Sequence, residues 1–285
     1  MDNSTSAGIS GLPVKLFKQL HHKICNILTN LFNDCIDSKS IPEKWKTAVV
    51  TPLYKKNGAI EDINNYRGIS VLPPIGKMFE RILSDQIKQH LNDNNLLFNG
   101  QYGFRSCHSC ESALHEVLSD MNRILSERKI GLYFFIDFKK AFDLVPTDIL
   151  IFKLKYGYGF DDNSIKLLTD YFKNRSQYVK IGNITSIICQ VLLGVPQGSV
   201  LGPLLFLLFI NDLPYFIKMF FTILFADDTT LSQNSDNLMK KYSFIFSTKA
   251  FSITTCSKNS IPKNIHIGIY FDYCATLCIY YSKSS

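Results

Sequence analysis

The stretch Phe225-Ala226-Asp227-Asp228 decides how this sequence is interpreted, because it places two adjacent carboxylates between two β-like segments. The apolar run 219–224 (MFFTIL) precedes it, and the polar stretch 229–232 (TTLS) follows it. This pattern predicts a β-hairpin with both aspartates at its tip. Like charges side by side destabilise a turn unless a cation or several hydrogen-bond donors hold them. The alternative interpretation is a solvated Asp-Asp turn.

A third carboxylate, Asp137, follows another β-like run, residues 132–136 (LYFFI). Only a folded sheet could unite Asp137 with Asp227 and Asp228, because the two groups are far apart in the sequence. Three carboxylates at two strand ends would form a divalent-metal site of the kind that phosphoryl-transfer enzymes use, with two cations about 3.5–4 Å apart. Hard carboxylate oxygens suit Mg²⁺, with Mn²⁺ as an alternative. These three residues are therefore the candidate catalytic and metal-binding residues.

Composition sets broad limits on the class of protein. The chain has 285 residues, of which 46% are hydrophobic, so it is long and apolar enough for one large or two modest domains. Its formal charge of +7 is compatible with a polyanionic partner. No secretory signal is visible at the N-terminus, so we expect an intracellular protein with reduced cysteines. The apolar run 204–210 is far shorter than the ~20 residues of a membrane span and predicts a buried helix, with no membrane partner.

Hydrophobic periodicity predicts an α+β fold with a mostly antiparallel sheet. Helices are expected at 13–35, 75–91, 108–126, 147–155 and 163–173, and strands at 46–53, 132–136, 176–181 and 186–193. The amino-acid composition changes after Leu238 and the sequence there shows no sustained helical period, so no helix or strand is predicted beyond it. We expect one domain over residues 1–238 and an unassigned tail over 239–285.

Several motifs occur in an order that characterises one family. They are Tyr66-Arg67-Gly68-Ile69-Ser70, Gly103-Phe104-Arg105 with His108-Ser109, FIDFKKAFD at 135–143, GVPQGSVLGP at 194–203, and FADD at 225–228. Together they closely resemble the reverse transcriptase domain of non-LTR (LINE-type), jockey-like retrotransposons, over about residues 7 to 235. FADD alone is a weak signal, whereas the last three motifs together are specific.

The resemblance implies a right-hand polymerase, of which this chain supplies the fingers and most of the palm. It maps Asp137, Asp227 and Asp228 onto the family's metal ligands. The implied reaction is RNA-directed DNA synthesis, in which a primer 3′-hydroxyl attacks the α-phosphate of a dNTP with the help of two Mg²⁺ ions. The implied partners are an RNA template, a DNA primer and dNTPs.

The resemblance also assigns nucleotide-binding residues. Phe142 matches the aromatic residue that packs under the sugar and excludes a 2′-hydroxyl, although ordinary core packing is the alternative. Gln197 matches a residue that touches the incoming nucleotide and the template. Gly198 lies in the same glycine-bearing loop, where close backbone approach to a nucleotide is possible. The alternative is a loop whose glycines only serve turns.

Cationic residues in matching segments imply phosphate contacts. Arg67 and Lys55 match the part of the fingers that grips the triphosphate, and a guanidinium suits bidentate phosphate binding. A solvated surface role is the alternative for both. Arg105 is expected to contact the template backbone. Cys107 and Cys110 with His108 invite a zinc interpretation, but four ligands are required and no second pair is present.

The sequence departs from the family in several places. Gly68 stands where proline is usual, and Ser10 replaces the acid of an entry motif at 7–11. No thumb is recognisable between 238 and 285, and we expect the endonuclease domain of most such elements to be missing. The resemblance therefore implies a partial copy whose activity is open, with any endonuclease supplied by another protein. The alternative is a non-catalytic remnant or nucleic-acid-binding fragment. Nuclear location is expected, although no targeting signal is evident, and the sequence does not predict the oligomeric state.

Overall fold

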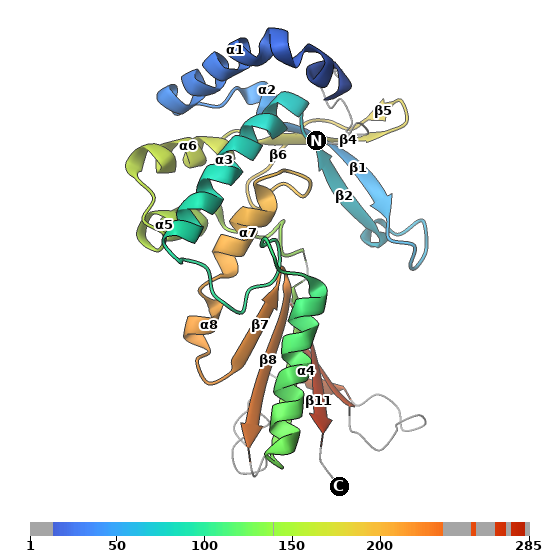
Figure 1. The fold of residues 1–285 in the computed structure, drawn as a ribbon. Coiled ribbons are helices and arrows are strands. Elements are labelled where there is room, and N and C mark those ends of the chain that lie inside the picture. The colour runs from blue at the N-terminus through green and yellow to red at the C-terminus, as the bar shows by residue number, and fades with distance from the viewer. Residues whose placement is uncertain (1–13, 139, 236–251, 255–265, 272–274, 283–285) are drawn as a thin grey trace. The chain divides into compact units, whose positions relative to one another are not determined.

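The computed structural model describes residues 14–138, 140–235, 252–254, 266–271 and 275–282. The chain forms two compact units, each built from two stretches of sequence (Figure 1). The first unit comprises residues 1–96 and 142–209, and the second comprises 97–141 and 210–285. Helices and mostly antiparallel strands make up both, which confirms the predicted α+β class. The entry motif at 7–11 lies outside the described residues.

The first unit combines a sheet with helices. Its elements are α1 (Val14–Ser38), α2 (Glu43–Lys46), β1 (Thr47–Tyr54), η2 (Ile63–Asn65), β2 (Tyr66–Val71), α3 (Pro74–Asp93), α5 (Thr147–Tyr156), α6 (Asp162–Phe172), β4 (Ser176–Ile181), β5 (Ile184–Thr185), β6 (Cys189–Gln190) and α7 (Gly202–Ile210). The strand order is β2-β1-β4-β5, and β6 also pairs with β4. β1 and β2 are antiparallel, whereas β1 and β4 are parallel.

Helix α3 shows why its sequence folds locally as predicted. Pro74 occupies the first turn, where a missing N–H costs no hydrogen bond. Apolar side chains then recur at helical spacing, and Phe79, Leu83, Ile87 and Leu91 are all buried. Burial of this stripe attaches α3 to the core of the first unit.

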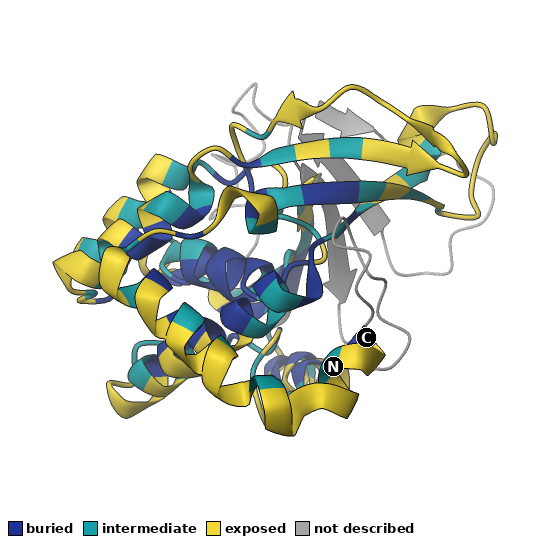
Figure 2. Cartoon of the chain, turned by 90° about the horizontal axis from the view of Figure 1, so that it is seen from above, coloured by how far each residue is buried: buried dark blue, intermediate teal, exposed yellow. Residues whose placement is uncertain are grey.

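Helix α7 is buried almost throughout, as the short apolar run predicted. Leu205 and Leu208 have no exposed surface. Figure 2 colours buried residues dark blue. Among the described residues, no helix is long and apolar enough to cross a membrane.

The second unit contains a six-stranded sheet. Its elements are α4 (Cys110–Ser126), β3 (Ile130–Phe138), α8 (Leu213–Phe216), β7 (Phe221–Phe225), β8 (Asp228–Ser235), β9 (Ser252–Thr254), β10 (His266–Phe271) and β11 (Ala275–Ser282). The strand order is β7-β8-β3-β11-β10-β9, and every neighbouring pair is antiparallel. The predicted hairpin and the strand before Asp137 are both present.

One face of this sheet packs against α4. Ala113, Val117 and Ile124 of the helix form a buried cluster with Tyr133 of β3 and Ile223 of β7. These contacts fix the sheet strands that end at the three candidate aspartates.

Two local expectations differ from the structure. The predicted strand at 186–193 is absent as a continuous element: the two-residue strand β5 precedes this region, and only the two-residue strand β6 lies within it. The ladder beyond β5 ends because the N–H of Val179 donates to Oγ of Ser186, 2.9 Å away, so a side chain replaces the main-chain acceptor. β2 is a strand that the sequence did not reveal.

The segment after 238 contributes β9, β10 and β11, where no element was expected. β11 pairs with β3 along its length, and Thr276 lies opposite Asp137 in the register. The proposed domain border at 238 stays a prediction.

Candidate active site

The β7–β8 hairpin delivers two carboxylates at its tip. β7 ends at Phe225 and β8 begins at Asp228, so Ala226 and Asp227 form a two-residue turn. Ala226 has φ +58°, a left-handed conformation that costs a non-glycine residue about 1–2 kcal/mol. Such strain persists only where the surroundings hold the backbone in place.

Asp137 lies directly opposite Asp228 in the antiparallel ladder between β3 and β8. Opposed residues in such a ladder have Cβ atoms about 4.5–5.5 Å apart. Asp227 precedes Asp228 in the turn, so all three aspartates lie at one end of the sheet. Their catalytic and metal-binding roles stay predictions.

Electrostatics show that these carboxylates influence one another. Burial raises the pKa of Asp228, and repulsion from Asp227 and Asp137 raises it further. A divalent cation would oppose this repulsion, and the hard oxygen donors suit Mg²⁺. Nevertheless, within the described ranges no three side chains are disposed as a ready metal-binding cluster.

A buried carboxylate aligns the strands that carry these residues. Asp120 of α4 accepts hydrogen bonds from the hydroxyls of Tyr133 (2.7 Å) and Ser232 (2.5 Å). Tyr133 and Ser232 are opposite each other in the ladder, four residues along each strand from the Asp137–Asp228 pair. The helix thus holds the register of the two strands, β3 and β8, that carry Asp137 and Asp228.

The predicted nucleotide-binding residues lie in the first unit and several of them are close together. The N–H of Val195 donates to the carbonyl of Phe142 (2.8 Å), and the N–H of Ser70 donates to the carbonyl of Gln197 (2.8 Å). A Cβ at Gly198, whose φ is +116°, would lie 2.5 Å from the Ser70 carbonyl oxygen. The loop 194–203 is therefore attached both to the Phe142 segment and to β2.

The remaining predicted residues have the following surroundings. Arg67 is exposed on β2, three residues before Ser70. Lys55 Nζ donates to the carbonyl of Asn64 (2.9 Å). Phe142 stacks on Phe206, with ring centroids 4.8 Å apart, which gives it a packing role whatever its role towards nucleotides.

Arg105 makes contacts within the second unit. Its Nη1 donates to the carbonyls of Phe98 (2.9 Å) and Gln101 (3.3 Å). These bonds stabilise the turn before the GFR motif. The expected contact with the template stays a prediction.

Glu80 of α3 is a residue that the motif analysis missed. Its Oε2 accepts from the N–H groups of Val200 (2.6 Å) and Leu201 (3.3 Å), and its Oε1 accepts from the Tyr171 hydroxyl (3.0 Å). Val200 and Leu201 belong to the loop 194–203, so this buried carboxylate secures the loop to α3. The sequence offered one signal for Glu80: it lies four residues after Gly76, within the buried stripe of α3.

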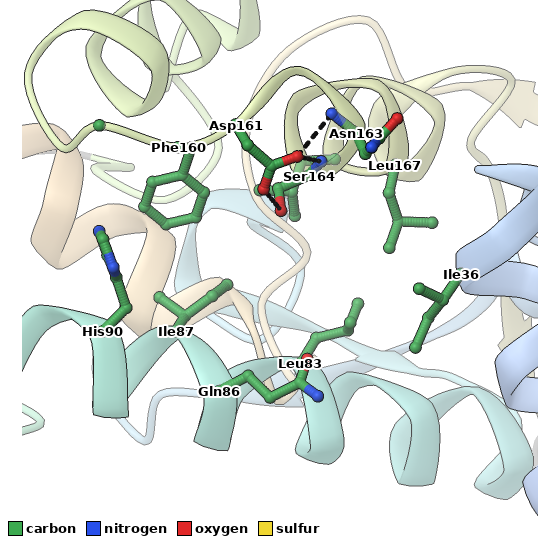
Figure 3. Close-up of a pocket in the computed structure, with 12 residues that line it drawn as sticks. Ile36, Leu83, Gln86, Ile87, His90, Phe160, Asp161, Asn163, Ser164 and Leu167 are labelled. Carbon is green, nitrogen blue, oxygen red and sulfur yellow. Dashed lines mark hydrogen bonds between the residues drawn. The ribbon is translucent and has the colours of Figure 1, made fainter.

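A cavity of about 470 Å³ lies elsewhere in the first unit, among α1, α3 and α6 (Figure 3). Asp161 caps α6 by accepting from the N–H groups of Asn163 (2.8 Å) and Ser164 (3.1 Å). His90 Nε2 lies 2.8 Å from the Tyr158 carbonyl. None of the nine residues proposed from the sequence lines this cavity, so it does not mark the candidate site.

Comparison with known sequences identifies curated relatives. The chain is 31% identical over 214 residues to the "Probable RNA-directed DNA polymerase from transposon BS" of Drosophila melanogaster, covering 75% of this chain and 22% of that protein. It is 26% identical over 232 residues to the "RNA-directed DNA polymerase from mobile element jockey" of the same organism, covering 79% and 25%. The chain thus spans about a quarter or less of these relatives. The resemblance to jockey-like elements is confirmed.

Comparison with solved structures supports the fold. The apo telomerase of Candida tropicalis truncated from its C-terminal domain superposes with a TM-score of 0.51 at 14% identity, covering 80% of this chain and 52% of the other. This likeness is consistent with the predicted polymerase fingers and palm. Residues 54–251 match the family described as reverse transcriptase (RNA-dependent DNA polymerase). The chain therefore belongs to the reverse transcriptase family.

Proposed function

We propose that this chain carries the nucleotidyl-transfer site of an RNA-directed DNA polymerase from a non-LTR retroelement. The observation that carries the proposal is the pairing of Asp137 with Asp228 across the ladder, with Asp227 in the adjoining turn. Asp137 and Asp228 come from strands far apart in sequence, and their pairing across the ladder supports the proposal.

The proposed reaction joins a dNMP unit to a primer. The 3′-oxygen attacks the α-phosphorus of a dNTP, the bond to pyrophosphate breaks, and the hydroxyl proton passes to solvent. Asp137, Asp227 and Asp228 would hold two Mg²⁺ ions, with Mn²⁺ as a substitute, which supply charge stabilisation to the attacking and leaving oxygens. The three carboxylates would position the reacting groups by holding these ions.

Nucleotide selection would fall to residues of the first unit. Arg67 and Lys55 would contact the triphosphate, and Gln197 with Gly198 would approach the incoming nucleotide. The proposal also includes Arg105 as a contact to the template backbone, and an RNA template and a DNA primer as partners. Work in the nucleus, with an endonuclease supplied by another protein, would fit such an element.

Primer extension on an RNA template tests this function. The purified chain is supplied with dNTPs and Mg²⁺ and compared with an Asp227→Asn, Asp228→Asn double variant. Extension by the wild type that is lost in the variant would support the proposal. A folded wild-type protein that binds an RNA–DNA duplex but does not extend it would instead identify a non-catalytic remnant.

Replacing Phe142 with valine tests its proposed selection against ribonucleotides. Removing a ring that excludes a 2′-hydroxyl should raise rNTP incorporation relative to dNTP by about 10–200-fold, the range typical of pocket-size changes. The ratio of kcat/KM for rNTP and dNTP measures this effect. Phe206→Leu is the control, because it removes the ring on which Phe142 stacks but leaves the ring of Phe142 in place. An equal fall in the use of both nucleotides by Phe142→Val would indicate packing alone.

A further inference from the structure

Residues 100–105, which we call the turn brace, run along the outer edge of β7. The N–H of Leu224 donates to the carbonyl of Gly100 (2.8 Å), and the N–H of Tyr102 donates to the carbonyl of Leu224 (2.7 Å). Gln101 and Leu224 thereby form a parallel bridge. Two main-chain bonds therefore attach the brace to Leu224, the last residue but one of β7.

Gly103 extends this contact to the turn itself. A Cβ at Gly103 would overlap the backbone N of Ala226 and would lie 2.9 Å from its Cα. Both atoms belong to the backbone and cannot rotate away as a flexible side chain could. Glycine is therefore required by close approach at this position.

Gln101 fixes the position of Gly103. Its Oε1 accepts from the Gly103 N–H (2.8 Å), and its side chain is fully buried. Arg105 adds two bonds, one to the carbonyl of Phe98, just before the brace, and one to the carbonyl of Gln101, within it. Hydrogen bonds within the brace therefore hold its own backbone in place, so the brace does not simply move along with the turn.

The brace contacts the backbone at Ala226, the residue with the strained conformation. Ala226 adopts φ +58°, and Asp227 and Asp228 follow it directly. A rotation at Ala226 would re-aim both carboxylates, and the backbone of Gly103 packs against the atoms that would move. The strained turn therefore has an identifiable support.

We propose that the turn brace holds the Ala226–Asp228 turn in the geometry that binds divalent cations, with Gln101 and Gly103 as positioning residues. This inference rests on the proposed metal site, but it assigns the brace a role of its own. Residues that orient metal ligands typically change metal affinity by about 10–100-fold when they are replaced.

The test uses the full chain with Mn²⁺ alone as the probe. Free Mn²⁺ is measured by electron paramagnetic resonance, and amide hydrogen exchange is measured at residues 226–229. Gly103→Ala is compared with Gly131→Ala, the same change within β3, where an added Cβ would meet only side chains at 3.1 Å or more. Asp227→Asn reports whether Mn²⁺ binds at the proposed carboxylates.

We expect Gly103→Ala to weaken Mn²⁺ binding at least tenfold and to accelerate exchange at the turn, while Gly131→Ala changes neither. Unchanged exchange and affinity in a folded Gly103→Ala protein would overturn the brace. If Asp227→Asn binds Mn²⁺ like the wild type, the proposed metal site fails. Hydrogen exchange in Gly103→Ala then still tests the brace: faster exchange at residues 226–229 shows that the brace supports the turn, and unaltered exchange shows that it does not. Should Gly103→Ala not fold, Gln101→Met removes only the acceptor for the Gly103 N–H and should shift both readouts in the same direction.

Discussion

Asp137→Asn should reduce dNMP transfer by at least about 10²–10³-fold, the loss typical when one preorganised electrostatic group is removed from an active site. The amide keeps the size of the carboxyl group but lacks its negative charge. Asp137 faces Asp228 across the ladder, so the proposed cation site would lose one of its three anionic donors. Single-turnover primer extension over a range of Mg²⁺ concentrations measures the loss.

Asp143→Asn is the matched control, because it makes the same change within the same sequence motif. Asp143 is exposed and belongs to the first unit, whereas Asp137 belongs to the second. We expect Asp143→Asn to retain extension within a few-fold. Equal losses in the two variants, or an Asp137→Asn protein within tenfold of the wild type, would contradict the assigned role of Asp137.

Glu80→Ala should lower the free energy of unfolding by about 3–5 kcal/mol, the cost typical of removing one partner from a buried polar or ionic group. The N–H groups of Val200 and Leu201 and the hydroxyl of Tyr171 would lose their acceptor. The nearby charge of Arg175, which is buried, would also lose its favourable interaction with the carboxylate. Urea unfolding followed by circular dichroism measures the change.

Glu80→Gln separates the hydrogen bonds from the charge. Burial raises the pKa of Glu80 above its ordinary value, and the charge of Arg175 and the hydrogen bonds only partly oppose this. The folded state therefore holds the proton of Glu80 more tightly than the unfolded state does. The stability that this proton contributes is fully present below the unfolded pKa of Glu80 and is lost as the pH rises through the folded pKa. Because glutamine does not titrate, the stability of the wild type relative to Glu80→Gln should fall as the pH rises. A difference that is constant with pH would contradict this expectation.

Local patterns predicted much of the fold. The hairpin around 225–228, the strand before Asp137 and helix α3 were all expected, because alternation, turn residues and helical spacing are encoded within short segments. The parallel pairing of β1 with β4 was not expected, since it joins segments more than a hundred residues apart. Such pairings depend on the global packing and leave little local signal.

The same distinction applies to the candidate site. The three aspartates follow strand-like runs, so their residue types and positions could be recognised directly. The steric need for Gly103 could not, because the atoms that forbid a side chain belong to Ala226, far along the chain. Glu80 gave a weak signal, a carboxylate on an apolar helix stripe, but its acceptor role towards Val200 became visible only in the fold.

The cover that residues 100–102 provide for β7 has a consequence for solubility. β7 stands at one end of its sheet, and exposed edge strands readily recruit strands of other chains. The run 220–225 (FFTILF) is apolar, uncharged and free of proline, which is the composition of segments that form intermolecular cross-β assemblies. By occupying the N–H and C=O of Leu224, the brace leaves fewer open groups on that edge. The segment proposed to support the turn therefore also covers part of the edge through which this apolar strand could pair with another chain.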